Sequence, residues 1–300
     1  MSETTGIDWH RRMADLGRGA TTPHPPLFAP MLFVAAAEIE AIAPTEFASD
    51  PTKIVKGVSE LSRMLGLKTA FAGVPCGMVA EALGARLDRE SWPPKAAAPS
   101  SEVVTDIDSF AEVWPRSALL AASLEATRRL ACASNGPLPF MALDGPARVA
   151  RQLFPEEGLS ERTSEFVGRA LAALVRDLAE AGTDAVVLVD EPSEQPTYRA
   201  SAVRTIGNVA RFHRRPLFSI MLGATPEEPP TTIPCVESAS VKPAARAFGT
   251  VLPATPAAWA DVAFEAPGRL VTTAEEVAHD ASIETLIPAV SSVLERLPSD

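Results

Sequence analysis

The sequence is poor in cysteine and in long apolar runs, and each deficiency argues against a class of protein. The 300 residues include three cysteines, Cys76, Cys132 and Cys235, without CxxC spacing and without a neighbouring pair of histidines. This number does not support a disulfide framework or a structural zinc site, and it is typical of a reducing compartment. No run approaches the ~18 apolar residues that a transmembrane helix needs.

Positive charge is also scarce. The chain has 27 Lys and Arg against 38 Asp and Glu, which gives a net charge of −11. A basic surface for nucleic acid is therefore not expected. The first twenty residues are polar and charged and lack the apolar core of a signal peptide. We expect a cytoplasmic protein that binds neither nucleic acid nor membrane.

The clearest pattern in the chain is the segment 171–192, LAALVRDLAEAGTDAVVLVDEP. Its first half places apolar residues on one face at helical spacing, and Gly182 follows where a helix commonly ends. Ala185 to Val189 is a continuous apolar run, which is typical of a parallel strand buried on both faces. The run ends in Asp190-Glu191-Pro192. A helix, a turn and a buried strand with carboxylates at its end form the repeating unit of an α/β barrel, whose chemistry lies at that end.

The rest of the sequence repeats this alternation. A single (β/α)₈ TIM barrel over residues 1–300 is predicted, with 1–22 as an N-terminal extension in which 8–16 forms a short helix over the lower end of the barrel. No GxGxxG or GxxxxGK[ST] motif points to an open-sheet nucleotide binder. Predicted strands are 27–34, 68–74, 138–143, 185–189, 216–222, 233–237, 250–252 and 269–272; predicted helices include 51–65, 109–130, 194–213, 255–265 and 282–297, with a helical turn at 242–248 and a mobile loop at 93–101.

Candidate site residues follow from the ends of the predicted strands. Asp144 and Asp190 directly follow strands, where an aspartate can cap the next helix or face the barrel mouth. Only one of Asp190 and Glu191 can point into the barrel. Arg148 can hold a substrate carboxylate or lie on a solvated helix face. Glu191, Glu237 and Met31 complete the substrate-binding candidates.

The order and spacing of several segments resemble the uroporphyrinogen decarboxylase superfamily, which also contains zinc-dependent methyltransferases that act on methylated corrinoids. This resemblance spans about 25–297 and implies a barrel whose pocket is lined by an acidic residue after the strand 185–189. It also implies a role for His279, which stands where the decarboxylases have a histidine. The segments are EFASDPTKIVKGV, AEALGARL, FMALDGPARVARQL, AGTDAVVLVDEP, PLFSIMLG, GTVLP and AHDASIETL.

Two departures from the resembled family restrict the function. The decarboxylases carry an arginine-rich segment after the first strand, whereas APMLFVAAAEIEAIAP contains no arginine. Uroporphyrinogen itself is therefore not the expected substrate. The methyltransferases have His-x-Cys at the end of the strand that reads SIMLG here. Ile220 and Leu222 stand at those positions and cannot coordinate zinc.

The sequence thus predicts a metal-free lyase that cleaves a carbon–carbon bond, as in decarboxylation, of a small carboxylate-bearing metabolite. Asp190 manages a proton, His279 and Asp144 assist, and Arg148 orients the carboxylate. No cofactor is required. The alternatives are methyl transfer, with zinc or a corrinoid, and a barrel that binds a ligand without catalysis. Apolar outer helices such as 286–297 permit a homodimer.

Overall fold

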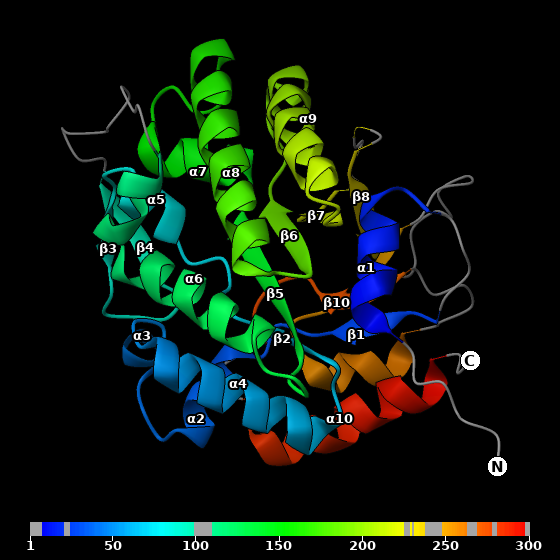
Figure 1. The fold of residues 1–300 in the computed structure, drawn as a ribbon. Coiled ribbons are helices and arrows are strands. Elements are labelled where there is room, and N and C mark those ends of the chain that lie inside the picture. The colour runs from blue at the N-terminus through cyan, green and yellow to red at the C-terminus, as the bar shows by residue number, and fades with distance from the viewer. Residues whose placement is uncertain are drawn as a thin grey trace.

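Eight parallel strands form the centre of the protein in a computed structural model that describes residues 8–20, 25–98, 110–224, 229, 231–237, 248–262, 269–277 and 281–297 (Figure 1). Every pair of hydrogen-bonded neighbours in this sheet is parallel. The spatial order is β1 (Leu27–Ala29), β10 (Leu270–Thr273), β9 (Gly249–Leu252), β8 (Ile233–Glu237), β7 (Leu217–Met221), β6 (Ala185–Asp190), β5 (Leu138–Asp144) and β2 (Thr69–Phe71).

The sheet curls until its two edge strands, β1 and β2, face each other. Within the described residues no backbone ladder joins these strands. A side chain bridges them instead, because the Thr69 hydroxyl of β2 donates a hydrogen bond of 3.1 Å to the Phe28 carbonyl of β1. The result is a nearly closed (β/α)₈ barrel, which confirms the predicted fold class.

Helices surround the barrel and, in the described residues, follow β1, β2, β5, β6, β9 and β10. An antiparallel hairpin of β3 (Arg86–Asp88) and β4 (Lys95–Ala98) stands apart from the main sheet. The α-helices are α1 (Trp9–Gly17), α2 (Phe33–Ile39), α3 (Pro44–Phe47), α4 (Pro51–Leu65), α5 (Met78–Ala82), α6 (Ala118–Ala131), α7 (Pro146–Leu153), α8 (Glu161–Ala181), α9 (Pro196–Phe212) and α10 (Ile283–Arg296); the 3₁₀ helices are η1 (Phe110–Glu112), η2 (Trp114–Arg116) and η3 (Pro256–Asp261).

Local signals explain where the long helices begin and end. The Asp50 carboxylate accepts hydrogen bonds from the backbone of Thr52 and Lys53, and α4 ends at Gly66 with a φ of 67°. Helix α8 begins at a capping box of Ser160 and Thr163 and ends at Gly182, whose φ is 97°. Only glycine adopts such φ values without cost. Both predicted boundaries of α4 and the predicted end of α8 are confirmed, whereas α8 begins ten residues before the segment in which it was predicted.

Several predicted elements differ from the structure. The first strand ends at Ala29, before Pro30, and the last two residues of the predicted strand, Phe33 and Val34, begin α2. The predicted helix 109–130 is broken into η1, η2 and α6, because Pro115 precedes a new cap at Ser117. The predicted loop 93–101 contains β4, which pairs with β3. Of the predicted helix 255–265, the described part up to residue 262 forms the 3₁₀ helix η3. The turn at 242–248 falls largely outside the described residues.

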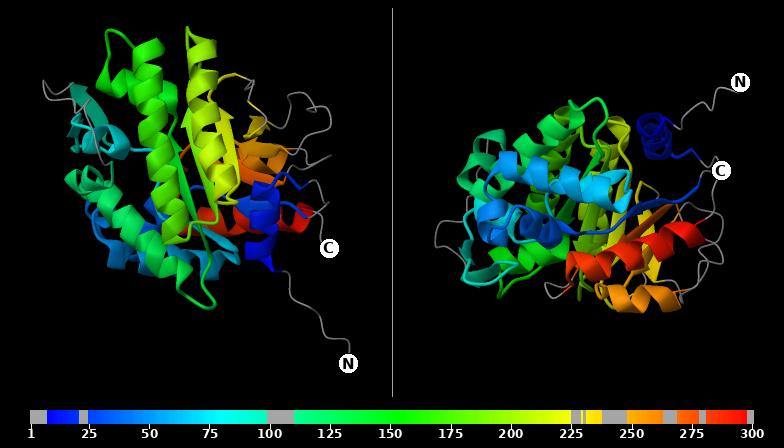
Figure 2. Two further views of the ribbon diagram at one scale, coloured as in Figure 1. Left: turned by 45° about the horizontal axis from the view of Figure 1, so that its top comes forward. Right: turned by 90° about the horizontal axis from the view of Figure 1, so that it is seen from below.

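The N-terminal and C-terminal helices close the barrel at its lower and outer sides. His10 of α1 lies 3.0 Å from Asp184, directly before β6, so α1 sits at the amino ends of the strands as the sequence predicted. Figure 2 shows α10 (red) beside η3 (orange). Arg296 joins these two helices, because its guanidinium donates to the backbone oxygens of Trp259 (2.7 Å) and Val262 (2.9 Å).

Burial is greatest in the middle of the barrel. Every residue of β5 and β6 is buried, and the rings of Phe71 and Phe140 meet edge to face with their centroids 5.8 Å apart. This pattern matches strands that are covered on both faces. Among the described helices, none combines the length and the apolar character that a membrane span needs.

The side-chain bridge between the edge strands gives a first prediction. Thr69→Val removes the donor to a buried carbonyl, so the free energy of unfolding should fall by about 1–3 kcal/mol. Thr205→Val is the matched control, since the Thr205 hydroxyl bonds only within exposed α9, and it should stay within about 0.5 kcal/mol of the wild type. Urea denaturation measures both. Equal stability of the two variants would mean that the bridge contributes nothing to barrel closure.

Candidate active site

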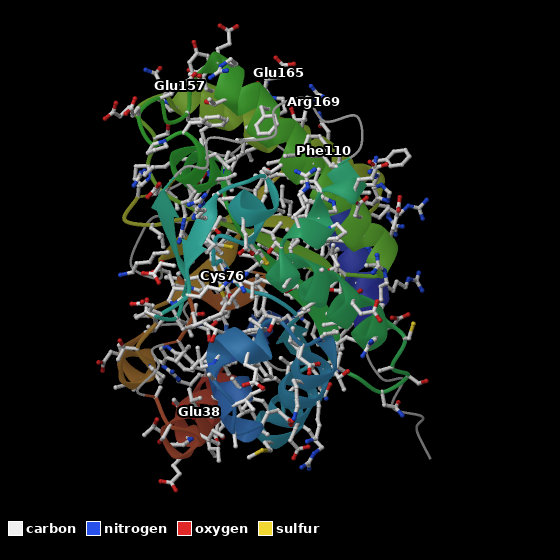
Figure 3. The ribbon with its side chains drawn as sticks, turned by 90° about the vertical axis from the view of Figure 1, so that its left-hand side faces the viewer. Glu38, Cys76, Phe110, Glu157, Glu165 and Arg169 are labelled. Carbon is white, nitrogen blue, oxygen red and sulfur yellow. The ribbon has the colours of Figure 1, made fainter. Side chains whose placement is uncertain are left out.

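Polar side chains gather where β2, β5, β6 and β10 end, at the carboxyl face of the barrel. They come from the segment after β2, the start of α7 and the segment after β10. Figure 3 shows the left-hand side of Figure 1, with Cys76 near the middle of the view and the hairpin ribbons of β3 and β4 beside it. We call this region the barrel mouth and define it by Cys76, Asp144, Arg148, Gln152, Glu275 and Glu276.

Asp144 is held tightly in the barrel mouth. Its side chain is 1% exposed. Its Oδ2 accepts a 2.8 Å hydrogen bond from the backbone of Gly77. Gly77 has a φ of 74°, and a Cβ there would lie 2.8 Å from Leu87 of the hairpin. The β2–α5 segment therefore needs glycine in order to deliver this backbone donor to Asp144.

Arg148 extends from the first turn of α7 toward both carboxylates beside it. Its Nε lies 3.0 Å from Asp144 Oδ1, and its Nη1 lies 3.6 Å from Glu275. The Arg148 side chain is 22% exposed, while that of Glu275 is 53% exposed. Within the described residues, buried Nη1 has no hydrogen-bond partner. The guanidinium is thus oriented by Asp144 and keeps donor capacity for an oxyanion.

Glu276 is a second carboxyl group in the barrel mouth, three residues after β10. Its Oε1 accepts a hydrogen bond of 2.8 Å from the backbone N–H of Val34, so it caps α2 from a distance. In the part of the chain that the structure describes, Oε2 is buried and has no partner. Burial raises the pKa of Glu276 to about 8, against the opposing effect of the α2 backbone donors. The group is therefore mainly protonated at neutral pH.

Cys76 lies near both carboxyl groups. It is 5% exposed. Burial, and after it the charge of Asp144, raises the pKa of the Cys76 thiol above its ordinary value. The side chain is therefore a neutral thiol at physiological pH, which makes it a poor nucleophile and a poor metal ligand.

Asp190 lies below the barrel mouth and forms a buried ion pair. It is fully buried, and its Oδ2 accepts a 2.7 Å hydrogen bond from Arg199 Nε of α9. Its Oδ1 accepts from the backbone N–H groups of Ala147 and Arg148, each at 3.1 Å. Burial raises the pKa of Asp190, and Arg199 opposes that rise. This geometry favours a positioning role; the predicted catalytic role of Asp190 stays a prediction.

Glu191, the neighbour of Asp190, points outward. Its carboxylate pairs with Arg151 on the exposed side of α7. Burial raises the pKa of Glu191, while Arg151 and then Arg148 lower it. An open cavity of about 610 Å³ lies between α7 and the start of α9, and Arg151 and Tyr198 lie on its wall. Of the two consecutive acids, Glu191, whose side chain is 23% exposed, is the one that reaches solvent.

The remaining predicted site residues, Met31, Glu237 and His279, are not among the residues that define the barrel mouth. Met31 is completely buried and joins β1 to β10, because its backbone N–H donates to Thr273 Oγ1 at 3.0 Å. This burial favours packing over substrate contact. Glu237 ends β8, and its side chain lies outside the described part of the chain. His279 also lies outside the described residues, so its predicted role stays a prediction.

The positions implied for a zinc site do not supply its ligands. Ile220, 2% exposed, belongs to β7, and Leu222 directly follows that strand. Cys235 is buried, with its sulfur 2.4 Å from where a Cβ of Gly249 would stand. Among the described residues, no three His, Cys, Asp or Glu side chains are grouped so as to hold a metal. These residues do not fit a thiolate-rich zinc ion.

Sequence reasoning missed four members of the barrel mouth: Cys76, Gln152, Glu275 and Glu276. Glu276 had a weak signal, since it forms an acidic pair with Glu275 just after the last strand. Gln152 had none. It lies one turn after Arg148 on α7, close to Gly77. In the structure as described, its Oε1 is a further buried atom without a partner.

The fold and this mouth define a (β/α)₈ barrel with charged groups at the carboxyl ends of its strands. A solved methyltransferase from Methanosarcina mazei has a similar fold, with a TM-score of 0.69 over 95% of this chain and 97% of that chain, at 13% sequence identity. At that identity the similarity concerns the fold. No protein-family model and no curated protein matches the sequence.

The buried ion pair gives the second prediction. Asp190→Asn removes the carboxylate charge that faces the buried Arg199 Nε at 2.7 Å, so the free energy of unfolding should fall by ~3–5 kcal/mol. Glu191→Gln breaks only the pair with exposed Arg151 and should change it by less than about 1 kcal/mol. Chemical denaturation at neutral pH tests both. An Asp190→Asn variant with wild-type stability but no turnover would support a catalytic Asp190 instead.

Proposed function

We propose that this chain is an enzyme of the uroporphyrinogen decarboxylase and methyltransferase superfamily, and that it acts on a small carboxylate-bearing substrate in the barrel mouth. One observation carries the proposal. Three buried polar atoms there, on α7 and after β10, have no hydrogen-bond partner among the described residues. Buried polar groups are normally paired, so an unpaired group in a folded protein is often a binding or catalytic group. The atoms are Arg148 Nη1, Gln152 Oε1 and Glu276 Oε2.

In this proposal Arg148 binds the substrate carboxylate. Asp144 fixes one side of the guanidinium through the 3.0 Å contact at Nε. The opposite edge, with Nη1, then faces the substrate. Glu275 is the group displaced, because it lies 3.6 Å away on a side chain that is half exposed. A charge-assisted pair in a shielded site is stronger than one in water.

Glu276 donates a proton. With a pKa of about 8 it holds its proton at neutral pH, and Oε2 is the free oxygen of the carboxyl group. A general acid works best when its pKa lies close to the working pH. The proton goes to the atom of the substrate that gains negative charge when a bond breaks.

Methyl transfer is the reaction class that we place first, because the fold comparison supports it better than the lyase reaction. Glu276 would protonate the group that loses its methyl. Cys76 is a neutral thiol and does not accept the methyl group, so the acceptor is a second substrate. The described residues do not form a thiolate–zinc site.

A carbon–carbon lyase is the second candidate. It is favoured by the same proton donor, since loss of CO₂ from a carboxylate leaves a carbanion that must be protonated. In that reaction Arg148 holds a carboxylate that is retained, and Glu276 protonates the adjacent carbon. Both candidates place Arg148 and Glu276 in the same roles and differ only in the bond that breaks.

A screen of methylated and unmethylated small carboxylic acids, with candidate methyl acceptors present, separates the two candidates by mass spectrometry. Loss of a methyl group to the acceptor supports methyl transfer, and loss of CO₂ supports the lyase. Binding of a ligand without turnover of any compound would favour the non-catalytic barrel.

The third prediction concerns the proton donor. Once a substrate is found, Glu276→Gln should lower kcat by roughly 10²- to 10⁴-fold, because the amide cannot give up a proton at this pH. The amide oxygen can still accept from Val34, so the fold is kept. Glu284→Gln, on the exposed side of α10, is the matched control and should leave kcat unchanged. Full activity of Glu276→Gln would remove this residue from the mechanism.

The fourth prediction is the pH profile of kcat/KM. The active form of Glu276 is the protonated one, so activity should be retained below pH 8 and should fall as the pH rises through about 8. The slope should approach one decade per pH unit above that value. Steady-state kinetics across the alkaline range measures it. A profile that rises through the same range would mean that Glu276 acts as a base.

A further inference from the structure

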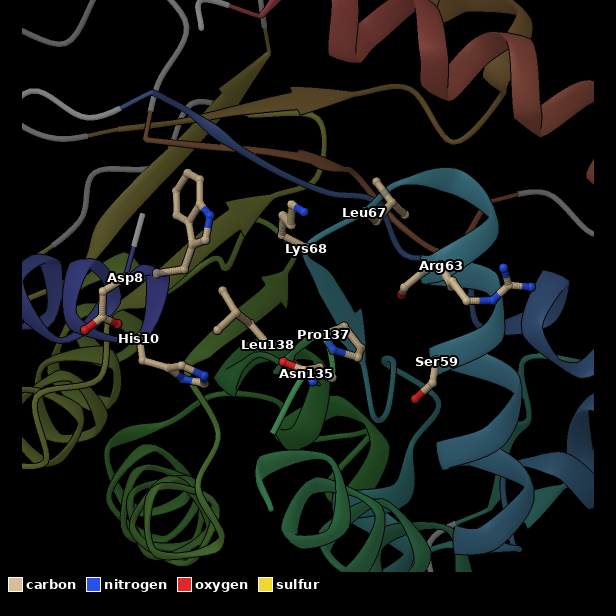
Figure 4. Close-up of a pocket in the computed structure, with 12 residues that line it drawn as sticks. Asp8, His10, Ser59, Arg63, Leu67, Lys68, Asn135, Pro137 and Leu138 are labelled. Atoms are coloured by element: carbon tan, nitrogen blue, oxygen red, sulfur yellow. The ribbon is translucent and has the colours of Figure 1, made fainter. Parts of the chain in front are cut away.

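A second pocket lies at the opposite end of the barrel, where the strands begin. Its volume is about 400 Å³, within the range of small-molecule sites. The start of α1, the last turns of α4, the turn into β2 and the segment before β5 form its walls (Figure 4). Helix α1 precedes the first strand of the barrel. The pocket therefore depends on an addition to the repeating fold.

Most charged groups around this pocket are already engaged. Asp8 caps α1, because it accepts a 3.0 Å hydrogen bond from the Arg11 backbone. Arg63 donates to Glu60 from Nε at 3.0 Å, and Figure 4 shows its guanidinium pointing away from Leu138 and Asn135. These groups keep little capacity for a ligand.

Two groups remain available. Lys68 has no ion-pair partner among the described side chains, and its backbone is fixed because its carbonyl accepts from Leu138 at 2.8 Å. His10 Nδ1 is held by Asp184 Oδ1 at 3.0 Å. Since a carboxylate accepts, Nδ1 carries the hydrogen, and Nε2 on the other side of the ring is left as an acceptor for a donor group of a ligand. The His10 ring points toward Leu138 and Asn135 (Figure 4).

The remaining wall is apolar and adjoins an amide. Trp9, Leu67, Pro137 and Leu138 supply apolar surface, and Asn135 supplies a donor and an acceptor. One uncommitted ammonium group beside apolar surface recognises one negative charge attached to an apolar body. A polyanion would leave negative charge unpaired, because the other charged side chains around the pocket already have partners.

We propose that this pocket is a second binding site, separate from the barrel mouth, for a small monoanion with an aromatic or other apolar body. Lys68 binds the anionic group and the Asn135 amide N–H donates to it, His10 Nε2 accepts a hydrogen bond from a donor elsewhere on the ligand, and Trp9 covers the apolar part. The site does not depend on the proposed reaction, because it lies at the face of the barrel opposite the mouth.

The test uses 8-anilinonaphthalene-1-sulfonate, a monoanion with aromatic rings, titrated into the full-length folded protein by calorimetry. One probe per chain should bind. Lys68→Met should weaken binding by about 10- to 100-fold, the effect of losing one charge-assisted hydrogen bond, and Lys68→Arg should largely restore it. Lys56→Met is the control. Lys56 is an exposed lysine of α4, the helix that also carries Arg63, and it pairs with Glu40, so its replacement should leave the affinity for the probe unchanged.

Two further measurements locate the probe and test its charge. N-phenyl-1-naphthylamine has the same rings without the sulfonate. It should bind the wild type more weakly than the sulfonate probe does, and it should bind Lys68→Met and the wild type with equal affinity. Trp9→Phe should reduce probe emission excited through tryptophan while direct excitation is unchanged. Three results would each overturn the proposal. They are no binding of the sulfonate probe to the wild type, equal affinity of this probe for Lys68→Met and the wild type, and equal affinity of the wild type for the neutral compound and the probe. Loss of catalytic activity in the barrel mouth would not bear on it.

Discussion

The buried carboxylate of Asp190 is the interaction on which the carboxyl face of this barrel depends. It contacts three elements: β6, to which it belongs, the first turn of α7, whose backbone it caps, and α9, through Arg199. Gly145 stands so close that a Cβ there would lie 2.4 Å from the Asp190 Cγ. The tight turn from β5 into α7 therefore exists because one residue is glycine and another is an acid. An ion pair buried to this degree carries a desolvation cost, which only complete pairing offsets.

This arrangement separates positioning from chemistry. Asp190 fixes the start of α7, α7 carries Arg148, and Asp144 aligns the Arg148 guanidinium from the preceding strand. Glu276 reaches the same mouth from the other side, held by the backbone of α2. Phe33 of α2 stacks on Trp92 of the hairpin, with ring centroids 5.8 Å apart. The acid and the cation are thus supported by different parts of the fold, so each can be altered without moving the other.

The sequence was sufficient for the barrel and for the helices with strong caps. Continuous apolar runs predicted β5 and β6, and Asp50, Gly66 and Gly182 placed the helix ends. The site was harder to predict. An aspartate after a strand has the same local sequence whether it faces the mouth, as Asp144 does, or pairs with a distant arginine, as Asp190 does. Arg199 is nine residues away in sequence, and its contact depends on how α9 packs. Glu276 became conspicuous only because the fold buries its carboxyl group beside α2.

The bridge between Thr69 and Phe28 has a consequence for how this protein behaves among other chains. A barrel without a closing backbone ladder still has two sheet edges, and exposed edges are templates on which foreign strands can add. Here both edge strands are only three residues long and are buried throughout. A strand of that length offers too few free backbone groups to nucleate pairing with another molecule. Because β1 and β2 are short and buried, the gap between them does not act as a site of aggregation.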